Sequence, residues 1–179
     1  MNRRRVVLFV LTVLILVGAG WLFYRWTFPF GYSHSCDKIL MFALDQYTDE
    51  HGGEYPAGEA TPEASLSLLY PKYADEYVLQ GKTVPIDLVK AILERGERLG
   101  PESCGWHYVE GLRKDDDTRL ALCWDKVGLG HNGQRLSDGG HFVLFVGLRQ
   151  EYIEGTKWEA FLEEQKKLLD ERRIHKQQK

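Results

Sequence analysis

The sequence predicts an α+β fold that follows an N-terminal membrane anchor. Three observations support this: an uncharged apolar run of 19 residues at Val6–Tyr24, helical spacing of apolar residues after Ser35, and strand-like alternation in the second half of the chain. The 179 residues, 44% of them hydrophobic and 27% charged, suit one globular domain and an additional segment. We expect a transmembrane helix leading into an amphipathic helix packed on a small antiparallel sheet, with a C-terminal helix.

The apolar run is long enough to cross a bilayer, because at 1.5 Å per residue it spans roughly the 30 Å hydrocarbon core. Three arginines, Arg3 to Arg5, precede it and predict that the N-terminus stays in the cytoplasm. Gly18-Ala19-Gly20 would suit signal-peptide cleavage, but the run continues past this site and exceeds the usual length of a signal-peptide core. We therefore predict an uncut anchor.

The expected organisation has four parts: a cytoplasmic basic segment at 1–5, a transmembrane anchor at 6–28, an extracytoplasmic domain at 30–155, and a C-terminal amphipathic helix and tail at 156–179. Four arginines and no acid lie in residues 1–25, which leaves 19 basic and 26 acidic residues and a net charge of −7 for the remainder. An acidic body excludes nucleic acid as the expected partner, because phosphate binding needs a basic face.

Helices are predicted at four places in the domain. The first starts at Ser35, ends at Gly52-Gly53 and follows the anchor almost continuously, with a break around Pro29 and Gly31. Its apolar face holds Cys36, Leu40, Ala43 and Tyr47, while Asp37, Asp45 and Asp49 lie off that face. The others start at Thr61-Pro62-Glu63, ending before Pro71; at Val84, ending near Leu93; and at Thr156, with Glu159 completing a capping box.

Strands are predicted after residue 103. Cys104–Gly111 and Thr118–Asp125 alternate large apolar with smaller or polar residues and flank a charged turn, so we expect a hairpin. Phe142–Leu148 is an apolar run typical of a buried strand. The apolar side of the C-terminal helix is lined by Trp158, Phe161, Leu162, Leu168 and Leu169.

Three stretches carry a resemblance to a known family. They are "ALDQYTDEHGGEYPAG" at Ala43–Gly58, "SLSLLYPKYADEYVL" at Ser65–Leu79, and the turn His131-Asn132-Gly133 followed by Val143-Leu144-Phe145. With the anchor before them, they resemble type IV pilin-like proteins and the pseudopilins of type II secretion, over most of residues 6–153. The resemblance implies a pilin-like domain outside the cytoplasmic membrane of a bacterium, with a non-catalytic structural or scaffolding role related to secretion. The implied partners are the bilayer and other envelope or pilin-like proteins.

The sequence departs from that family in two ways. Pilins and pseudopilins are cleaved between a glycine and a phenylalanine and carry a glutamate early in the mature helix, whereas "RRRVVLFVL" has no such glycine and no acid occurs before Asp37. The family's Asp-Gly after the last strand is replaced by Val146-Gly147-Leu148. We therefore expect a pilin-like domain that remains a membrane-anchored monomer or has a role outside filaments.

Two loops contain residues typical of metal sites. His131, Asp138 and His141 would supply three ligands, or the side chains of a hydrolase, if the loop folded back on itself. Their spacing matches no zinc signature, and Asn132-Gly133 and Asp138-Gly139 are strong turn signals, so we favour a turn; an exported metal-binding protein or hydrolase is the alternative. Asp115, Asp116 and Asp117 would suit calcium or a solvated hairpin tip, and we favour the tip. The sequence thus predicts no catalytic, cofactor-binding or metal-ligating residue.

The chain has three cysteines, so at least one is unpaired within it. If the hairpin turn centres near Arg113-Lys114, Cys104 faces Cys123 at a separation that a disulfide can span. Closing this loop of about 20 residues would stabilise the fold by roughly 3 kcal/mol. Cys36 could instead approach the sheet and pair with either partner. A shift of one residue in the register would point the two hairpin thiols to opposite faces.

Overall fold

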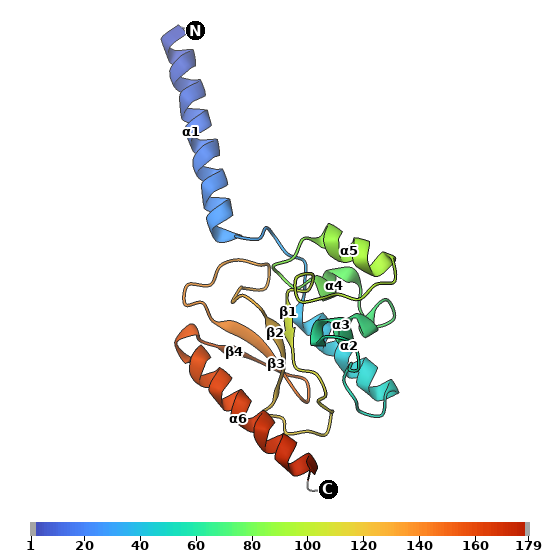
Figure 1. Cartoon of the computed structure of the whole chain (residues 1–179). Coiled ribbons are helices and arrows are strands. Elements are labelled where there is room, and N and C mark those ends of the chain that lie inside the picture. Colours follow the sequence, from blue (N-terminus) through green and yellow to red (C-terminus); the bar gives the residue numbers. More distant parts are fainter. Residues whose placement is uncertain (1–2, 178–179) are drawn as a thin grey trace.

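The computed structural model describes residues 3–177 and has an α+β fold: a long apolar helix, a four-stranded antiparallel sheet and a C-terminal helix (Figure 1). The helices are α1 (Arg3–Thr27), α2 (Asp37–Glu50), α3 (Pro62–Leu66), α4 (Glu76–Gln80), α5 (Ile86–Glu94) and α6 (Trp158–Gln177). The strands are β1 (Trp106–Tyr108), β2 (Ala121–Asp125), β3 (His141–Phe145) and β4 (Arg149–Ile153).

The sheet has the order β1-β2-β3-β4, and helices cover both of its faces (Figure 1). The larger core lies between one face and α2–α5, where Leu40 and Leu44 of α2 join Cys123 and Leu144 of the sheet. A smaller core lies under α6 on the other face. It contains Ala121, Trp124, Val143, Phe145 and Phe161.

Helix α1 projects from the domain (Figure 1), and all its residues up to Trp26 are exposed. Within residues 3–177 it is the one helix long and apolar enough to cross a membrane. Residues 1 and 2 of the predicted cytoplasmic segment lie outside the described residues. The predicted break around Pro29 and Gly31 is present, but it is longer than expected, because residues 28–36 are not helical. Pro29 has no N–H to continue the helix, and Gly31 adopts φ +89°.

The predicted helices after the anchor are confirmed, with one addition. Thr61 caps α3 by accepting a hydrogen bond from the Ala64 N–H at 3.1 Å. Helix α4 was not predicted; it has five residues, and the Asp75 side chain caps it by accepting the Val78 N–H at 3.0 Å. Helix α6 begins at Trp158 after a short 3₁₀ turn, so the expected capping residue Thr156 lies within that turn. Residues 178 and 179 of the predicted tail lie outside the described residues.

The predicted strands are present but shorter, and a fourth follows them. Strand β3 ends at Phe145 because Gly147 and Leu148 adopt φ +82° and +63°, the left-handed conformation of a tight turn. The chain returns as β4, pairing Phe145 with Arg149 and His141 with Ile153. Strand β4 was not predicted, because its residues are largely polar and exposed, as an edge strand allows.

The predicted Cys104–Cys123 disulfide was wrong, and all three cysteines are free thiols. The hairpin pairs Tyr108 with Cys123, so the register differs by four residues from the predicted one. The turn lies further along the chain because Arg113 forms an isolated bridge with Glu54 and does not begin the turn. An even shift keeps both side chains on the same face, and both thiols are therefore buried in the larger core.

Candidate functional site

His131, Asp138 and His141, the three residues of the loop weighed as a metal site, have separate structural roles. His131 is exposed in its turn, and His141 begins β3, where its ring stacks on Trp158 with 3.8 Å between centroids. Asp138 accepts hydrogen bonds from the Tyr152 hydroxyl and from the Gly155 N–H, the latter at 3.3 Å. No group of three His, Cys, Asp or Glu side chains within the described residues could hold a metal ion. The loop is a turn that Asp138 ties to β4.

The acidic triplet at the β1–β2 turn is also tied to the fold. Asp115 lies 3.2 Å from Arg113, and Asp117 lies 2.6 Å from Arg119. Asp116 lies 2.6 Å from Arg172 of α6 and accepts the Arg113 N–H at 2.6 Å. Each carboxylate therefore faces a guanidinium, which favours the predicted hairpin tip over a calcium site.

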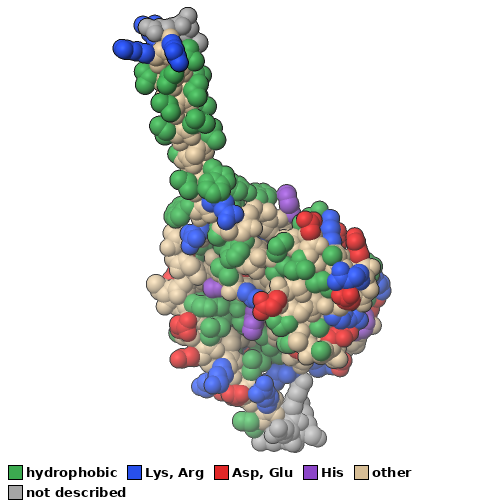
Figure 2. All heavy atoms as spheres, turned by 45° about the horizontal axis from the view of Figure 1, so that its top comes forward, with side chains coloured by type: hydrophobic (Ala, Val, Ile, Leu, Met, Phe, Trp, Pro, Cys, Tyr) green, Lys and Arg blue, Asp and Glu red, His purple; other side chains and the backbone are tan. Residues whose placement is uncertain are grey.

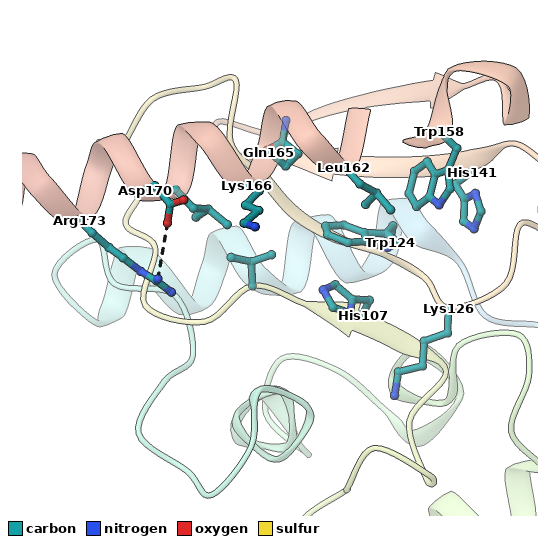
Figure 3. Close-up of a pocket in the computed structure, with 12 residues that line it drawn as sticks. His107, Trp124, Lys126, His141, Trp158, Leu162, Gln165, Lys166, Asp170 and Arg173 are labelled. Atoms are coloured by element: carbon teal, nitrogen blue, oxygen red, sulfur yellow. Dashed lines mark ion pairs between the residues drawn. The ribbon is translucent and has the colours of Figure 1, made fainter. Parts of the chain in front are cut away.

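A groove of about 550 Å³ opens between α6 and the outer face of β1 and β2 (Figure 3). Its floor is aromatic: Trp124 stacks on His107 at 4.2 Å and meets Trp158 edge-on at 5.9 Å between ring centroids. His107 and Trp124 are directly opposite in the β1–β2 ladder, so the pleat points both side chains to this face. Leu162 and Leu169 of α6 form the far wall.

Positive side chains surround the mouth of this groove. Lys126 lies 2.9 Å from Glu63, and Arg173 lies 3.7 Å from Asp170, so a carboxylate partly offsets the charge of each of these two cations. Lys166 is a third cation in the lining of the groove. Burial lowers the pKa of His141, and partial burial against Trp124 lowers the pKa of His107. Both rings are therefore neutral at pH 7, able to donate from one nitrogen and accept at the other.

One nitrogen at this groove lacks a protein partner. His141 is buried, and its Nδ1 makes no hydrogen bond in the structure. A buried polar atom without a partner costs free energy, and this atom lies behind the groove surface, where it is sealed from solvent. The groove as a whole suits a flat or branched apolar group that carries a negative charge next to it.

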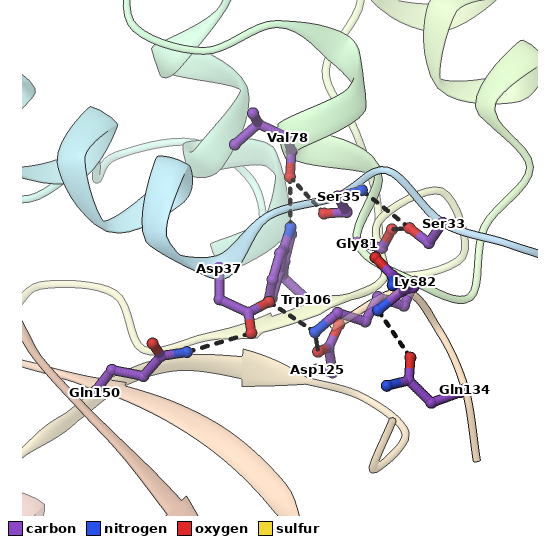
Figure 4. A network of polar contacts seen from close by, with 11 residues as sticks. Ser33, Ser35, Asp37, Val78, Gly81, Lys82, Trp106, Asp125, Gln134 and Gln150 are labelled. Atoms are coloured by element: carbon purple, nitrogen blue, oxygen red, sulfur yellow. Dashed lines mark hydrogen bonds and ion pairs between the residues drawn. The ribbon is translucent and has the colours of Figure 1, made fainter. Parts of the chain in front are cut away.

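A second polar cluster lies on the opposite face of the sheet and is sealed from solvent (Figure 4). The side chains of Lys82, Asp37 and Asp125 are 0%, 5% and 1% exposed. Lys82 Nζ donates to Asp37 Oδ1 at 2.7 Å and also to Asp125 Oδ2. The same Nζ lies 5.5 Å from the Trp106 ring centroid. We call these four residues the lysine cluster.

Burial and charge act in opposite directions in the lysine cluster. Burial alone would lower the pKa of Lys82, but the two carboxylates outweigh it and raise that pKa. Burial raises the pKa of Asp125 to about 7, although Lys82 opposes the shift. Asp37 keeps a further partner, since Gln150 Nε2 donates to its Oδ2 at 3.3 Å. The cluster is an ion pair with a second acid whose charge depends on pH.

The lysine cluster joins three segments that are distant in sequence: the first residue of α2, the loop after α4, and the last residue of β2. The loop can reach the cluster because Gly81 lies against Gly105, where an added Cβ would come within 2.7 Å of the Gly105 Cα. Gly81 also adopts φ +70°. Asp37 was predicted to lie off the buried face of its helix, and this was wrong, since it is buried. Its helical position is correct, but β2 and β4 cover that side as well.

Comparison with known protein families, curated proteins and solved structures finds no match to this chain.

Proposed function

We propose that this chain is a single-pass membrane protein whose pilin-like domain has a non-catalytic, structural or scaffolding role in the bacterial cell envelope, related to secretion. One observation carries the proposal: an apolar helix of 25 residues precedes α2, and α2 packs on a four-stranded antiparallel sheet. The pilin-like motifs of the sequence add to it. Arg3 to Arg5 favour a cytoplasmic N-terminus, with the domain outside the cytoplasmic membrane.

The placement of the polar residues supports a structural role. Asp138 fixes the start of the β3–β4 hairpin to its end, and the lysine cluster joins α2 to the sheet. The predicted alternative, an exported metal-binding protein or hydrolase, needed His131, Asp138 and His141 to converge. The structure gives these three residues different neighbours, so we do not pursue that alternative.

A scaffold needs a surface for its partner, and we assign that role to the groove beside α6. Its aromatic floor and three cations favour an acidic segment of another envelope protein that inserts an aromatic or branched side chain.

Anchoring and orientation are tested together on the full chain in its own membrane. We expect mass spectrometry to find an N-terminus that has not been cut within the anchor; a mature start anywhere in residues 17–31 would contradict the anchor. A cysteine at Asp115, which is 79% exposed, should react with a membrane-impermeant maleimide from outside the cytoplasmic membrane. Labelling only after the membrane is broken would reverse the proposed topology.

The scaffolding role is tested by photo-crosslinking in cells, with a photoreactive residue at Lys166 or at Glu164. These positions lie on opposite sides of α6, because successive helical residues turn by about 100°. We expect Lys166 to crosslink to an envelope protein through an acidic segment, and Glu164 to give no such product. Lys166→Glu should abolish the contact, and reversing the partner's charges should restore it. Equal products at both sites, or none at either, would refute the partner groove.

A further inference from the structure

The junction between α1 and the domain is fixed by hydrogen bonds. The last carbonyls of a helix have no partner within the helix. Here the Arg135 N–H donates to the Thr27 carbonyl at 2.7 Å, and Arg135 Nε donates to the Trp26 carbonyl at 3.3 Å. A cation at this end also complements the helix dipole. A loop that is distant in sequence therefore closes the end of the anchor.

Hydrogen bonds also fix the connector, residues 28–36, which joins α1 to α2. The Ser33 N–H donates to the Asn132 carbonyl at 3.0 Å, and Ser33 Oγ donates to the Gly81 carbonyl at 3.2 Å. Gly133 approaches so closely that an added Cβ would lie 3.1 Å from the Gly31 oxygen. The connector thus has no free length with which to move the domain away from the end of α1.

This arrangement places the connector at the membrane surface. About 20 helical residues span the hydrocarbon core, so a span that starts at Val6 reaches its far side near Arg25. The headgroup layers bring the bilayer to about 40–45 Å, that is, several ångströms beyond the core on each side. Residues 28–34, which follow directly, must lie in or against this layer.

The domain surface at this junction is apolar and cationic. Phe30 and Tyr32 of the connector are 53% and 51% exposed, and Val127, from the loop after β2, is 40% exposed. Phe30, Val127 and Leu136 line one shallow hollow of about 360 Å³, together with Arg135. Figure 2 shows hydrophobic and cationic side chains around the base of the projecting helix, with the acidic side chains farther out over the domain.

We infer that Phe30, Tyr32, Val127, Leu136 and Arg135 form a second membrane-contact surface, which rests in the headgroup layer of the bilayer that α1 crosses. Aromatic rings prefer this layer, and the arginine can meet lipid phosphates. The occupant is the phospholipid bilayer, since the connector leaves no distance between this surface and the lipid. The contact goes beyond anchoring, because it sets the orientation of the domain. The C-terminal end of α6 then points away from the membrane (Figure 1).

The test uses the full chain in phosphatidylcholine vesicles, with an environment-sensitive dye on one introduced cysteine. Cys36→Ser removes the partly exposed native thiol, while Cys104 and Cys123 are buried. The dye is placed at Val127→Cys, at Asp115→Cys on the far turn, or at Trp21→Cys within the anchor. Lipids that carry a quencher near the headgroup end of the acyl chain are then added.

We expect the dye at position 127 to lose most of its fluorescence and the dye at 115 to lose none. Quenching at position 21 reports insertion of the anchor independently. Quenching at 21 without quenching at 127 would overturn the second contact while leaving the anchor and the proposed scaffold intact.

Two variants test whether Phe30 and Tyr32 hold this surface against the bilayer. Phe30→Ser with Tyr32→Ser should reduce quenching at position 127, because the surface loses its aromatic contacts. Ile174→Ser, at an exposed apolar position near the far end of α6, is the matched control and should change nothing. If the double variant is quenched as strongly as the parent, Phe30 and Tyr32 do not hold this surface against the bilayer.

Discussion

Polar residues on the two faces of the sheet have different environments: they are sealed from solvent on one face and line an open groove on the other. Toward α2–α5, Asp125 and Trp106 point into a core where Lys82 and Asp37 complete a sealed ionic cluster. Toward α6, the adjacent residues Trp124 and His107 point into a groove open to solvent. The two environments are one residue apart in each strand, because the pleat alternates side chains between the faces.

This difference suggests separate roles for the two faces, one in the stability of the fold and the other in the proposed binding of a partner. The sealed face links segments distant in sequence through buried ion pairs, although Asp125 Oδ1 has no hydrogen-bond partner. The open face keeps neutral histidines, a histidine nitrogen without a protein partner, and cations at its mouth. We therefore expect substitutions on the sealed face to change the free energy of unfolding, and those at the groove mouth to change partner binding.

The largest effect is expected for Lys82→Met. It leaves Asp37 and Asp125 buried without their cation, and breaking a buried ion pair in this way typically costs about 3–5 kcal/mol. Denaturant unfolding of the full chain in detergent, followed by tryptophan fluorescence, measures the loss. The matched control replaces all three charged residues with apolar ones and should recover most of the stability. A triple variant as unstable as the single one would show that packing, not charge, explains the loss.

A smaller effect is expected at the border of the open face for Gln165→Met. Gln165 Oε1 accepts the Ala121 N–H at 2.7 Å, and its Nε2 donates to the Arg119 carbonyl at 3.1 Å. Methionine keeps the volume but leaves a buried N–H without a partner, which costs about 1–3 kcal/mol. Gln165→Glu retains the acceptor and serves as the control. Equal losses in both variants would mean that the Ala121 contact contributes little.

The lysine cluster should also make stability depend on pH. The native state keeps the Asp125 proton up to about pH 7, whereas the unfolded chain loses it near pH 4. The contribution of Asp125 to the unfolding free energy therefore falls as pH rises from about 4 to 7, by at most about 1.4 kcal/mol per pH unit. In Asp125→Asn this contribution is absent, so its stability relative to the parent should rise over the same range. A difference that is constant with pH would place the pKa of Asp125 outside this window.

The smallest effect on stability is expected for Lys166→Glu at the groove mouth. The residue is exposed, and surface substitutions of this kind usually change the free energy of unfolding by less than about 0.5 kcal/mol. The same variant is expected to lose the crosslink to an acidic partner. Thermal unfolding of this variant and of Glu164→Lys, measured in parallel, separates the two effects. A large loss of stability in Lys166→Glu alone would show that this residue stabilises the fold, and the loss of the crosslink could then not be assigned to partner binding.

Local patterns were sufficient to predict most elements of the fold. The apolar run predicted α1, helical spacing predicted α2 and α6, and Thr61-Pro62-Glu63 predicted the start of α3. These features depend on neighbours within a few residues. Strand β4 and the short α4 were missed because both take their stability from tertiary packing and carry only weak periodicity.

Contacts between distant residues were decided by the tertiary structure alone. The sequence determined a long apolar helix followed by an amphipathic helix, a sheet and a C-terminal helix, because hydrophobic periodicity and turn residues act locally. It did not determine that Asp37 turns inward to Lys82, that Tyr108 and not Cys104 pairs with Cys123, or that Arg135 closes the end of α1. Each of these contacts depends on strand register or on how a loop docks. A shift of one or two residues would change the contact partner of each side chain, while the local pattern of apolar and polar residues would stay almost the same.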